Sequence, residues 1–191
     1  MRKLTFEFPL LCAFLLLSPL YSNAAATHPK LNNKNNAMDA LVNKACSRRT
    51  DDKLACINYL KSNPKVMAAA TSKPLDVALA IIQSGADEAK KTQAYLSKPK
   101  GKLSPQAIQA YNFCKTEWDT LASGLEWSVK TIKEVKGYAT ETADYDLMGT
   151  LEHGRSCATK LVEAQIKDPV ITKGLENAQL AVVAALPFLS G

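Results

Sequence analysis

The sequence has little from which a catalytic or metal site could be built. Its 191 residues include two histidines and eight glycines, and 7% of them are aromatic. His28 lies in a polar N-terminal stretch and His153 in a predicted helix, and neither has the neighbours of a metal site or of a nucleophile elbow. We therefore expect no catalytic residue, no metal ligand, no cofactor and no enzymatic activity.

Other absences narrow the class of protein further. No segment alternates apolar and polar residues as a strand would, and glycine and proline fall almost entirely between helical segments, which indicates an all-α fold. The formal charge is +6, but the basic residues are scattered and form no stripe with aromatic residues, so we expect neither a nucleic acid nor a membrane partner. A weak contact with a polyanionic polysaccharide and a merely solvated lysine-rich surface are both consistent with this charge.

Residues 1–24 are predicted to be a secretory signal peptide. Arg2 and Lys3 form its basic start, residues 8–20 are mostly Leu, Phe and Ala, and residues 22–24 offer small side chains for cleavage. The apolar run is too short and too interrupted by proline for a membrane span, and an uncleaved anchor is the alternative. We expect residues 25–191 to form one secreted domain.

Six helical segments are predicted after this leader, and residues 25–36 are expected to be an irregular start. The segments cover residues 38–45, 53–61, 72–96, 104–136, 142–166 and 168–187. Apolar residues recur at steps of three and four in the long segments, most clearly in the series Tyr111, Cys114, Trp118, Leu121, Leu125, Ser128, Ile132 and Val135. Four such helices with short links predict an antiparallel up-and-down four-helix bundle with an N-terminal helical hairpin extension.

Four cysteines follow the leader, and an even number in a secreted chain points to disulfides. Three pairings are possible. Cys46 and Cys56 flank a polar turn and would close a hairpin. Cys114 and Cys157 are equidistant from the helix break near Gly137, so they meet if the second and third long helices pack antiparallel. Free buried thiols are the alternative.

The order and spacing of these motifs resemble the plant invertase and pectin methylesterase inhibitor family over essentially the whole chain after the leader. Each motif is weak alone, and their order with the cysteine spacing carries the resemblance. The similar stretches are residues 46–60, with both cysteines of the first pair, residues 103–114, residues 151–157 and residues 179–186.

The resemblance implies a secreted inhibitor that docks a bundle surface against the active-site cleft of a plant pectin methylesterase or acid invertase. It also implies a location in the apoplast or cell wall, with the vacuole second. The Pro-Lys-Phe triplet associated with invertase inhibitors is absent, which slightly favours pectin methylesterase. Residues 148–150 also depart from the family's Ala-rich run. A relative that has lost inhibition and a secreted helical carrier of a small apolar ligand are the alternatives.

One bulky residue lies off the apolar face of its helix. Trp127 shares its face with small polar residues, and tryptophan is enriched among binding hot spots. This predicts a partner-binding surface at Trp127, Thr120, Ser123 and Thr131. Packing of Trp127 beneath the hairpin or a neighbouring helix is the alternative. Asp144 and Asp146 could be taken as a glycosidase carboxylate pair, but a place at a helix N-terminus explains them better.

Overall fold

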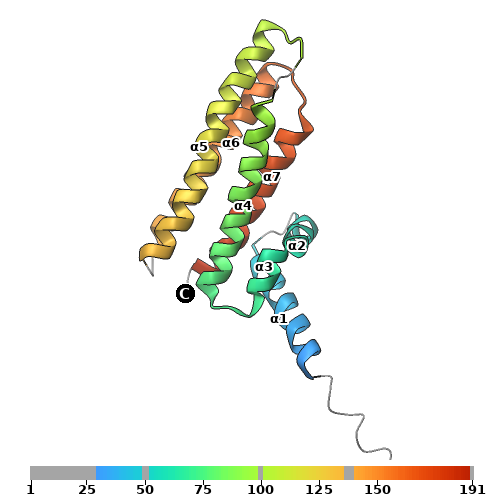
Figure 1. The fold of residues 1–191 in the computed structure, drawn as a ribbon, viewed down its shortest axis with the longest axis vertical. Helices are drawn as coiled ribbons and strands as arrows, with labels where there is room; N and C mark the ends of the chain where they lie inside the picture. Colours follow the sequence, from blue (N-terminus) through green and yellow to red (C-terminus); the bar gives the residue numbers. More distant parts are fainter. Residues whose placement is uncertain (1–28, 49–51, 99–100, 136–139, 190–191) are drawn as a thin grey trace, which may run out of the picture.

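The computed structural model describes residues 29–48, 52–98, 101–135 and 140–189, so the predicted signal peptide lies outside the described residues. The described part contains helices and no strand, which confirms the all-α expectation (Figure 1). Its elements are α1 (Pro29–Ala45), α2 (Lys53–Lys61), α3 (Pro64–Ala68), the 3-10 helix η1 (Ala69–Thr71), α4 (Pro74–Leu96), α5 (Pro105–Val135), α6 (Thr140–Glu163) and α7 (Pro169–Leu189).

The four long helices α4 to α7 lie side by side (Figure 1). Helix α4 packs against both α5 and α7, and α6 packs against the same two helices. The short helices α1 to α3 lie beside one end of α4 and α7. Two of the four predicted partner-binding residues, Trp127 and Thr120, line a groove between α5 and α6.

The core follows the apolar periodicity of the sequence. On α5, Trp118, Leu121 and Leu125 are fully buried, and Cys114, Ser128 and Ile132 are buried beside them. The prediction for Val135 is wrong, because this residue ends α5 and is 58% exposed.

Small residues let the long helices approach closely. A Cβ atom on Gly85 of α4 would lie 2.7 Å from the Ala181 Cβ of α7. One on Gly154 of α6 would lie 2.7 Å from Leu175 of α7. Real Cβ atoms do not come so near, so a larger residue at Gly85 would push α4 and α7 apart, whereas one at Gly154 would first displace the ends of the leucine side chains around it.

Two helix starts differ from the prediction. The expected irregular start is wrong from Pro29 onward, because α1 begins there, and proline suits a first helical position since its missing N–H is not needed. Residues 25–28 lie outside the described residues. The break at Asn63 and Pro64 also begins a new helix, because the Asn63 side chain accepts the backbone N–H groups of Lys65 at 3.1 Å and Val66 at 3.3 Å.

Helix α6 ends three residues before its predicted end. Gln165 adopts a left-handed conformation with φ of 57°. Its N–H bonds the Val162 carbonyl at 2.9 Å, and the Ile166 N–H bonds the Leu161 carbonyl at 2.8 Å. This is the Schellman arrangement that closes a helix, and it normally uses glycine at the left-handed position. Because Gln165 stands where a glycine is usual, the end of α6 is not marked by a glycine in the sequence.

Two disulfides tie these elements together. Cys46 at the end of α1 is bonded to Cys56 of α2, with Cα atoms 5.9 Å apart. Cys114 of α5 is bonded to Cys157 of α6, with Cα atoms 4.6 Å apart. All four cysteines are buried. The Cys114–Cys157 bond holds α5 and α6 in a fixed register, and the candidate partner-binding site lies on these two helices.

Candidate partner-binding site

Trp127 lies on the solvent-facing side of α5. Its side chain is 56% exposed, although its inner edge lines a small cavity with Ala143 and Asp146 of α6. Tyr145 of α6 is 79% exposed. Large aromatic side chains that only pack the core are normally buried. Two exposed ones on neighbouring helices therefore indicate a binding surface.

Both aromatic residues line one surface groove between α5 and α6. The groove has a volume of about 310 Å³. Helix α5 contributes Thr120, Gly124, Trp127 and Ser128, and helix α6 contributes Tyr145, Asp146, Gly149, Thr150 and His153. We call this feature the α5–α6 groove. It lies between two helices that a disulfide bond joins.

The four partner-binding residues predicted from the sequence divide into two groups. Trp127 and Thr120 line the α5–α6 groove. Thr131 lines the small cavity under Trp127 instead, and Ser123 is exposed on α5 beside the groove without lining it. The structure therefore brings two of the four together and leaves the other two at the margin.

The sequence led us to expect that the next long helix adjoins the Trp127 surface, but it identified no residue on the α6 side of the groove. Tyr145, Gly149, Thr150 and His153 all come from this helix. One signal was available, since Tyr145 lies off the apolar series of α6 as Trp127 lies off that of α5. Which face of α6 lies beside Trp127 depends on helix packing, which the periodicity of one helix does not specify.

Two glycines shape the groove. A Cβ on Gly124 would lie 2.7 Å from the Thr150 side chain, so α5 and α6 come close together at this point. Gly149 has open space where its Cβ would be. The close approach and the missing side chain together keep the groove shallow and accessible between its two aromatic residues.

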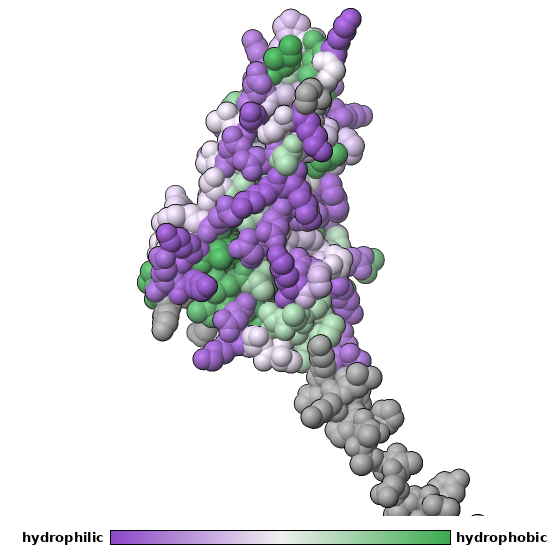
Figure 2. Space-filling view, in the orientation of Figure 1, coloured by the Kyte–Doolittle hydropathy of each residue, from purple (hydrophilic) through white to green (hydrophobic). Residues whose placement is uncertain are grey.

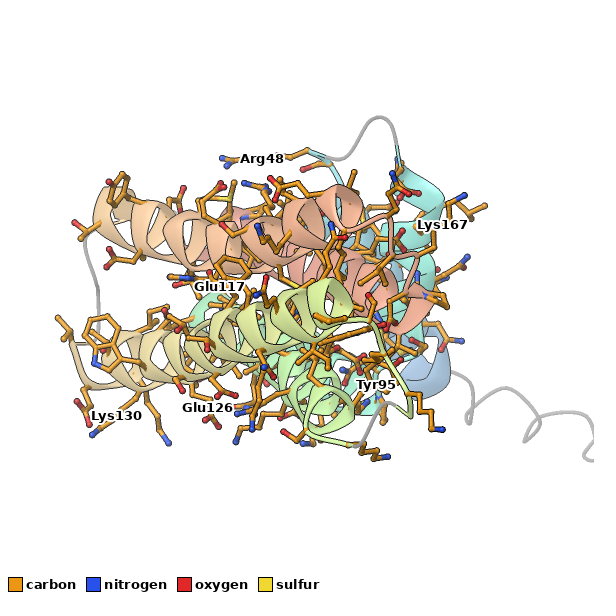
Figure 3. All side chains as sticks on the ribbon, turned by 90° about the horizontal axis from the view of Figure 1, so that it is seen from above. Arg48, Tyr95, Glu117, Glu126, Lys130 and Lys167 are labelled. Atoms are coloured by element: carbon orange, nitrogen blue, oxygen red, sulfur yellow. A yellow bond between two sulfur atoms is a disulfide. The ribbon has the colours of Figure 1, made fainter. Side chains whose placement is uncertain are left out.

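The polar groups of the groove are already held in place. His153 Nδ1 lies 2.8 Å from Glu117 Oε2, which joins α6 to α5, and Figure 3 shows Glu117 directed toward α6. The Thr120 hydroxyl donates to the Thr116 carbonyl at 3.1 Å, and the Thr150 hydroxyl donates to the Asp146 carbonyl at 2.8 Å. The hydroxyl oxygens keep lone pairs for a partner's donors, so the groove offers acceptors beside exposed aromatic rings.

Asp144 and Asp146 do not behave as a catalytic pair. Residues two apart on a helix point to different sides, and Asp146 alone lines the groove. Burial raises the pKa of Asp144, and the positive charge of Arg48 lowers it in part. Among the residues that the structure describes, no group of three or more His, Cys, Asp or Glu side chains could hold a metal ion.

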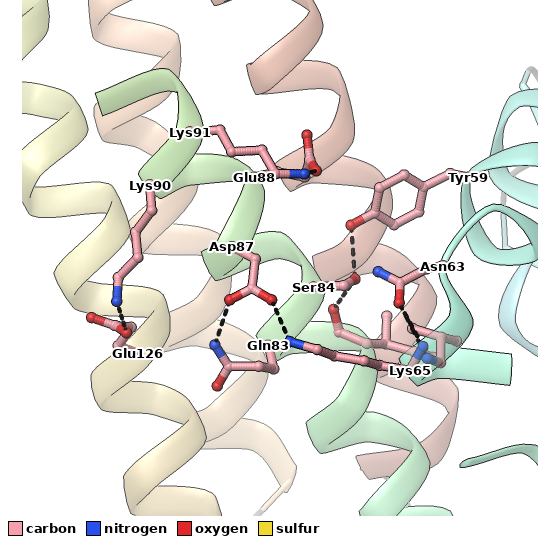
Figure 4. Close-up of polar contacts among 12 residues, drawn as sticks. Tyr59, Asn63, Lys65, Gln83, Ser84, Asp87, Glu88, Lys90, Lys91 and Glu126 are labelled. Atoms are coloured by element: carbon pink, nitrogen blue, oxygen red, sulfur yellow. Dashed lines mark hydrogen bonds and ion pairs between the residues drawn. The ribbon is translucent and has the colours of Figure 1, made fainter. Parts of the chain in front are cut away.

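A second polar cluster holds the N-terminal helices against the long ones (Figure 4). The Tyr59 and Ser84 hydroxyls are 2.8 Å apart, and Lys65 donates to Asp87 at 3.2 Å. Burial raises the pKa of Tyr59 to about 12. Since these groups bind one another across α2, α3 and α4, we assign the cluster a structural role.

One comparison with known proteins identifies a family for this chain. The family model described as plant invertase/pectin methylesterase inhibitor matches residues 40–185, from within α1 to near the end of α7, including all four bonded cysteines. No curated protein and no solved structure matches the chain. No helix in the described ranges is long and apolar enough to span a membrane.

Proposed function

The chain belongs to the plant invertase/pectin methylesterase inhibitor family, and on this premise we propose that it inhibits a plant pectin methylesterase by stoichiometric docking onto the active-site cleft. Acid invertase is the second candidate target. The protein contributes no catalysis of its own, and its action is to exclude the substrate. The missing Pro-Lys-Phe triplet is the reason to rank pectin methylesterase first.

The pair of exposed aromatic residues beside the α5–α6 groove is the observation that carries this proposal. Trp127 and Tyr145 are 56% and 79% exposed, and tryptophan and tyrosine are the side chains most often found as hot spots of protein interfaces. Each can bury a large apolar area while its polar tip bonds the partner. We therefore place the contact at Trp127, Tyr145, Thr120 and Thr150, with Ser123 and Thr131 at its margin.

Rigid docking fits the way the two groove helices are built. The Cys114–Cys157 bond and the hydrogen bond between Glu117 and His153 both join α5 to α6. A surface that is already ordered loses little conformational entropy on binding, so more of its contact energy appears as affinity.

The finer architecture is also an inference. We infer that α4 to α7 form an antiparallel up-and-down four-helix bundle and that α1 and α2 form the hairpin extension. Short connections, the mutual packing of the four long helices and the disulfide of the N-terminal pair support this arrangement.

The proposed location is outside the cell, in the apoplast or cell wall, with the vacuole second. The predicted leader and the two disulfides support it, since disulfides persist in oxidising compartments. The carrier alternative is less well supported, because Trp118, Leu121 and Leu125 fill the centre between the long helices.

The direct test is to titrate purified pectin methylesterase and acid invertase with the protein from residue 25 onward and to measure residual activity from acidic to neutral pH. We expect loss of pectin methylesterase activity that ends near one inhibitor per enzyme. Inhibition of invertase alone would reverse the ranking of targets. Full activity of both enzymes would leave the chain a non-inhibitory member of its family.

A further inference from the structure

The two ends of the long helices differ in charge. We call the end where α4 leads into α5 and α6 leads into α7 the loop end. In its described segments, 95–98, 101–105 and 160–173, the charged residues are Lys98, Lys102, Lys160, Lys167 and Lys173 against Glu163 and Asp168. At the opposite end, the described segments 73–80, 128–135 and 142–147 contain Lys73, Lys130 and Lys133 against Asp76, Glu134, Asp144 and Asp146.

The negative charge of Asp168 is directed inward. This side chain is 5% exposed and accepts the hydroxyls of Tyr95 at 2.9 Å and Tyr111 at 3.0 Å. It also accepts the backbone N–H groups of Val170 at 3.1 Å and Ile171 at 3.3 Å, at the start of α7. The only acid left near the surface of these segments, Glu163, is paired with Lys160 at 2.9 Å.

The same contacts hold the lysine-bearing segments together. Asp168 bonds a tyrosine from α4 and one from α5, so the ends of α4, α5 and α7 meet at this carboxylate. The Lys98 N–H donates to the Tyr95 carbonyl at 3.2 Å, and Lys167 directly precedes Asp168. Figure 3 shows Tyr95 and Lys167 at one end of the long helices and Lys130 toward the other.

Three ammonium groups at the loop end remain available to a partner. Lys98, Lys102 and Lys167 are exposed and form no ion pair within the described ranges, whereas Lys160 and Lys173 pair with neighbouring glutamates. Unpaired lysines on a rigid base create a positive potential that attracts polyanions.

An apolar groove lies next to these charges. It has a volume of about 770 Å³ and is formed where α6 ends and α7 begins. Val162, Ile166 and Pro169 contribute apolar walls. The charged residues that line the groove are Lys167, Lys173, Asp168 and Glu176, of which Glu176 pairs with Lys173 and Asp168 is buried. Figure 2 shows hydrophobic and hydrophilic side chains next to one another at the upper end, where these segments lie. Apolar walls beside ammonium groups suit a sugar ring that carries a carboxylate.

We propose that the loop end binds an acidic polysaccharide, specifically a linear polyuronate. The choice of polyuronate rests on the proposed function, because removal of methyl esters from pectin leaves a chain of galacturonate carboxylates. The described loop-end segments contain no arginine, and their tyrosine is directed to Asp168, so they lack the stacking groups typical of nucleic-acid sites. Binding would hold the inhibitor where product of the enzyme accumulates.

The test compares two triple variants that remove the same charge. Lys98→Gln with Lys102→Gln and Lys167→Gln removes the loop-end lysines. Lys53→Gln with Lys73→Gln and Lys133→Gln removes three exposed lysines elsewhere, which also form no ion pair in the described structure. Binding to polygalacturonate is measured at low and physiological ionic strength, with fully methylated pectin, dextran and duplex DNA as comparison probes.

The loop-end variant should lose about tenfold or more in affinity for polygalacturonate, and the matched variant less than about threefold. Wild-type binding should weaken as salt rises, because salt screens the lysines. Equal loss in both variants, equal binding to methylated pectin or to DNA, or no wild-type binding to polygalacturonate would overturn the proposal. Measuring inhibition of pectin methylesterase in parallel distinguishes the polysaccharide proposal from the inhibitor proposal. The loop-end variant should inhibit the enzyme normally, and Trp127→Ala should bind polygalacturonate normally.

Discussion

Tyr95 and Tyr111 at the loop end direct their hydroxyl groups to the buried Asp168, whereas Trp127 and Tyr145 beside the α5–α6 groove remain exposed. The first pair connects three helix ends through one carboxylate. The second pair makes little use of its polar atoms and aromatic faces within the fold. The difference indicates that the two tyrosines of the loop end support stability, whereas the two aromatic side chains of the groove are available for a protein partner, so mutations of the two pairs should have separable effects.

The largest loss of stability is expected from Cys114→Ser combined with Cys157→Ser. The Cys114–Cys157 bond spans 43 residues and stabilises the folded state by about 4 kcal/mol, because it restricts the unfolded chain. The Cys46–Cys56 bond spans 10 residues and should contribute about 3 kcal/mol. Urea denaturation of both double variants measures the difference. An unchanged midpoint for the first variant would mean that the bond does not contribute to stability.

Asp168→Ala should cost about 3 kcal/mol of unfolding free energy. It leaves two tyrosine hydroxyls and two N–H groups of α7 without their acceptor, and part of this set is buried. Asp76→Ala, at an exposed first-turn position of α4, is the matched control and should cost about 0.5 kcal/mol. If the two variants were equally stable, the loop end would not have the structural role assigned to it.

Trp127→Ala should separate binding from folding. We expect inhibition to weaken by about 2 kcal/mol, about 30-fold in affinity, while the unfolding free energy changes by less than about 1 kcal/mol. Phe113→Ala is the control, since Phe113 lies on the same helix, is 38% exposed and does not line the groove. A large loss of stability with full inhibition by the folded fraction would make Trp127 a packing residue.

Alkaline pH should weaken the contacts of Tyr111 at the loop end, as it should those of Tyr59 between α2 and α4. Burial, with the nearby Asp168, raises the pKa of Tyr111 to about 12, above its ordinary value of 10.0. The folded state therefore keeps this proton while the unfolded state loses it, so stability is complete below pH 10 and falls as pH rises toward 12. Tyr111→Phe should flatten that decline in denaturation curves, and Tyr145→Phe should leave it unchanged. The same slope in both variants would contradict this assignment.

Much of the long-helix core could be predicted, because each helix has its own apolar period. The buried series from Cys114 to Ile132 needed only the spacing of residues along one segment. The end of α6 could not be predicted in this way, because Gln165 adopts a backbone conformation that usually requires glycine.

The candidate site was only half predictable. Trp127 was identified because it departs from the apolar face of α5. Whether Tyr145 and Gly149 lie beside Trp127 depends on how α5 and α6 pack, and Gly124 allows α5 to approach Thr150 of α6 closely. Contacts between helices depend on relative rotation and register, and no pattern within a single helix encodes them.

Hydroxyl-radical footprinting of the inhibitor, alone and mixed with pectin methylesterase, tests the docking surface most directly. Mass spectrometry would read the oxidation of Trp127 and Tyr145 in the groove and of Phe113 outside it. The account predicts strong protection of both groove residues in the complex and unchanged oxidation of Phe113. A stable complex in which Trp127 and Tyr145 are oxidised as in the free protein would contradict it.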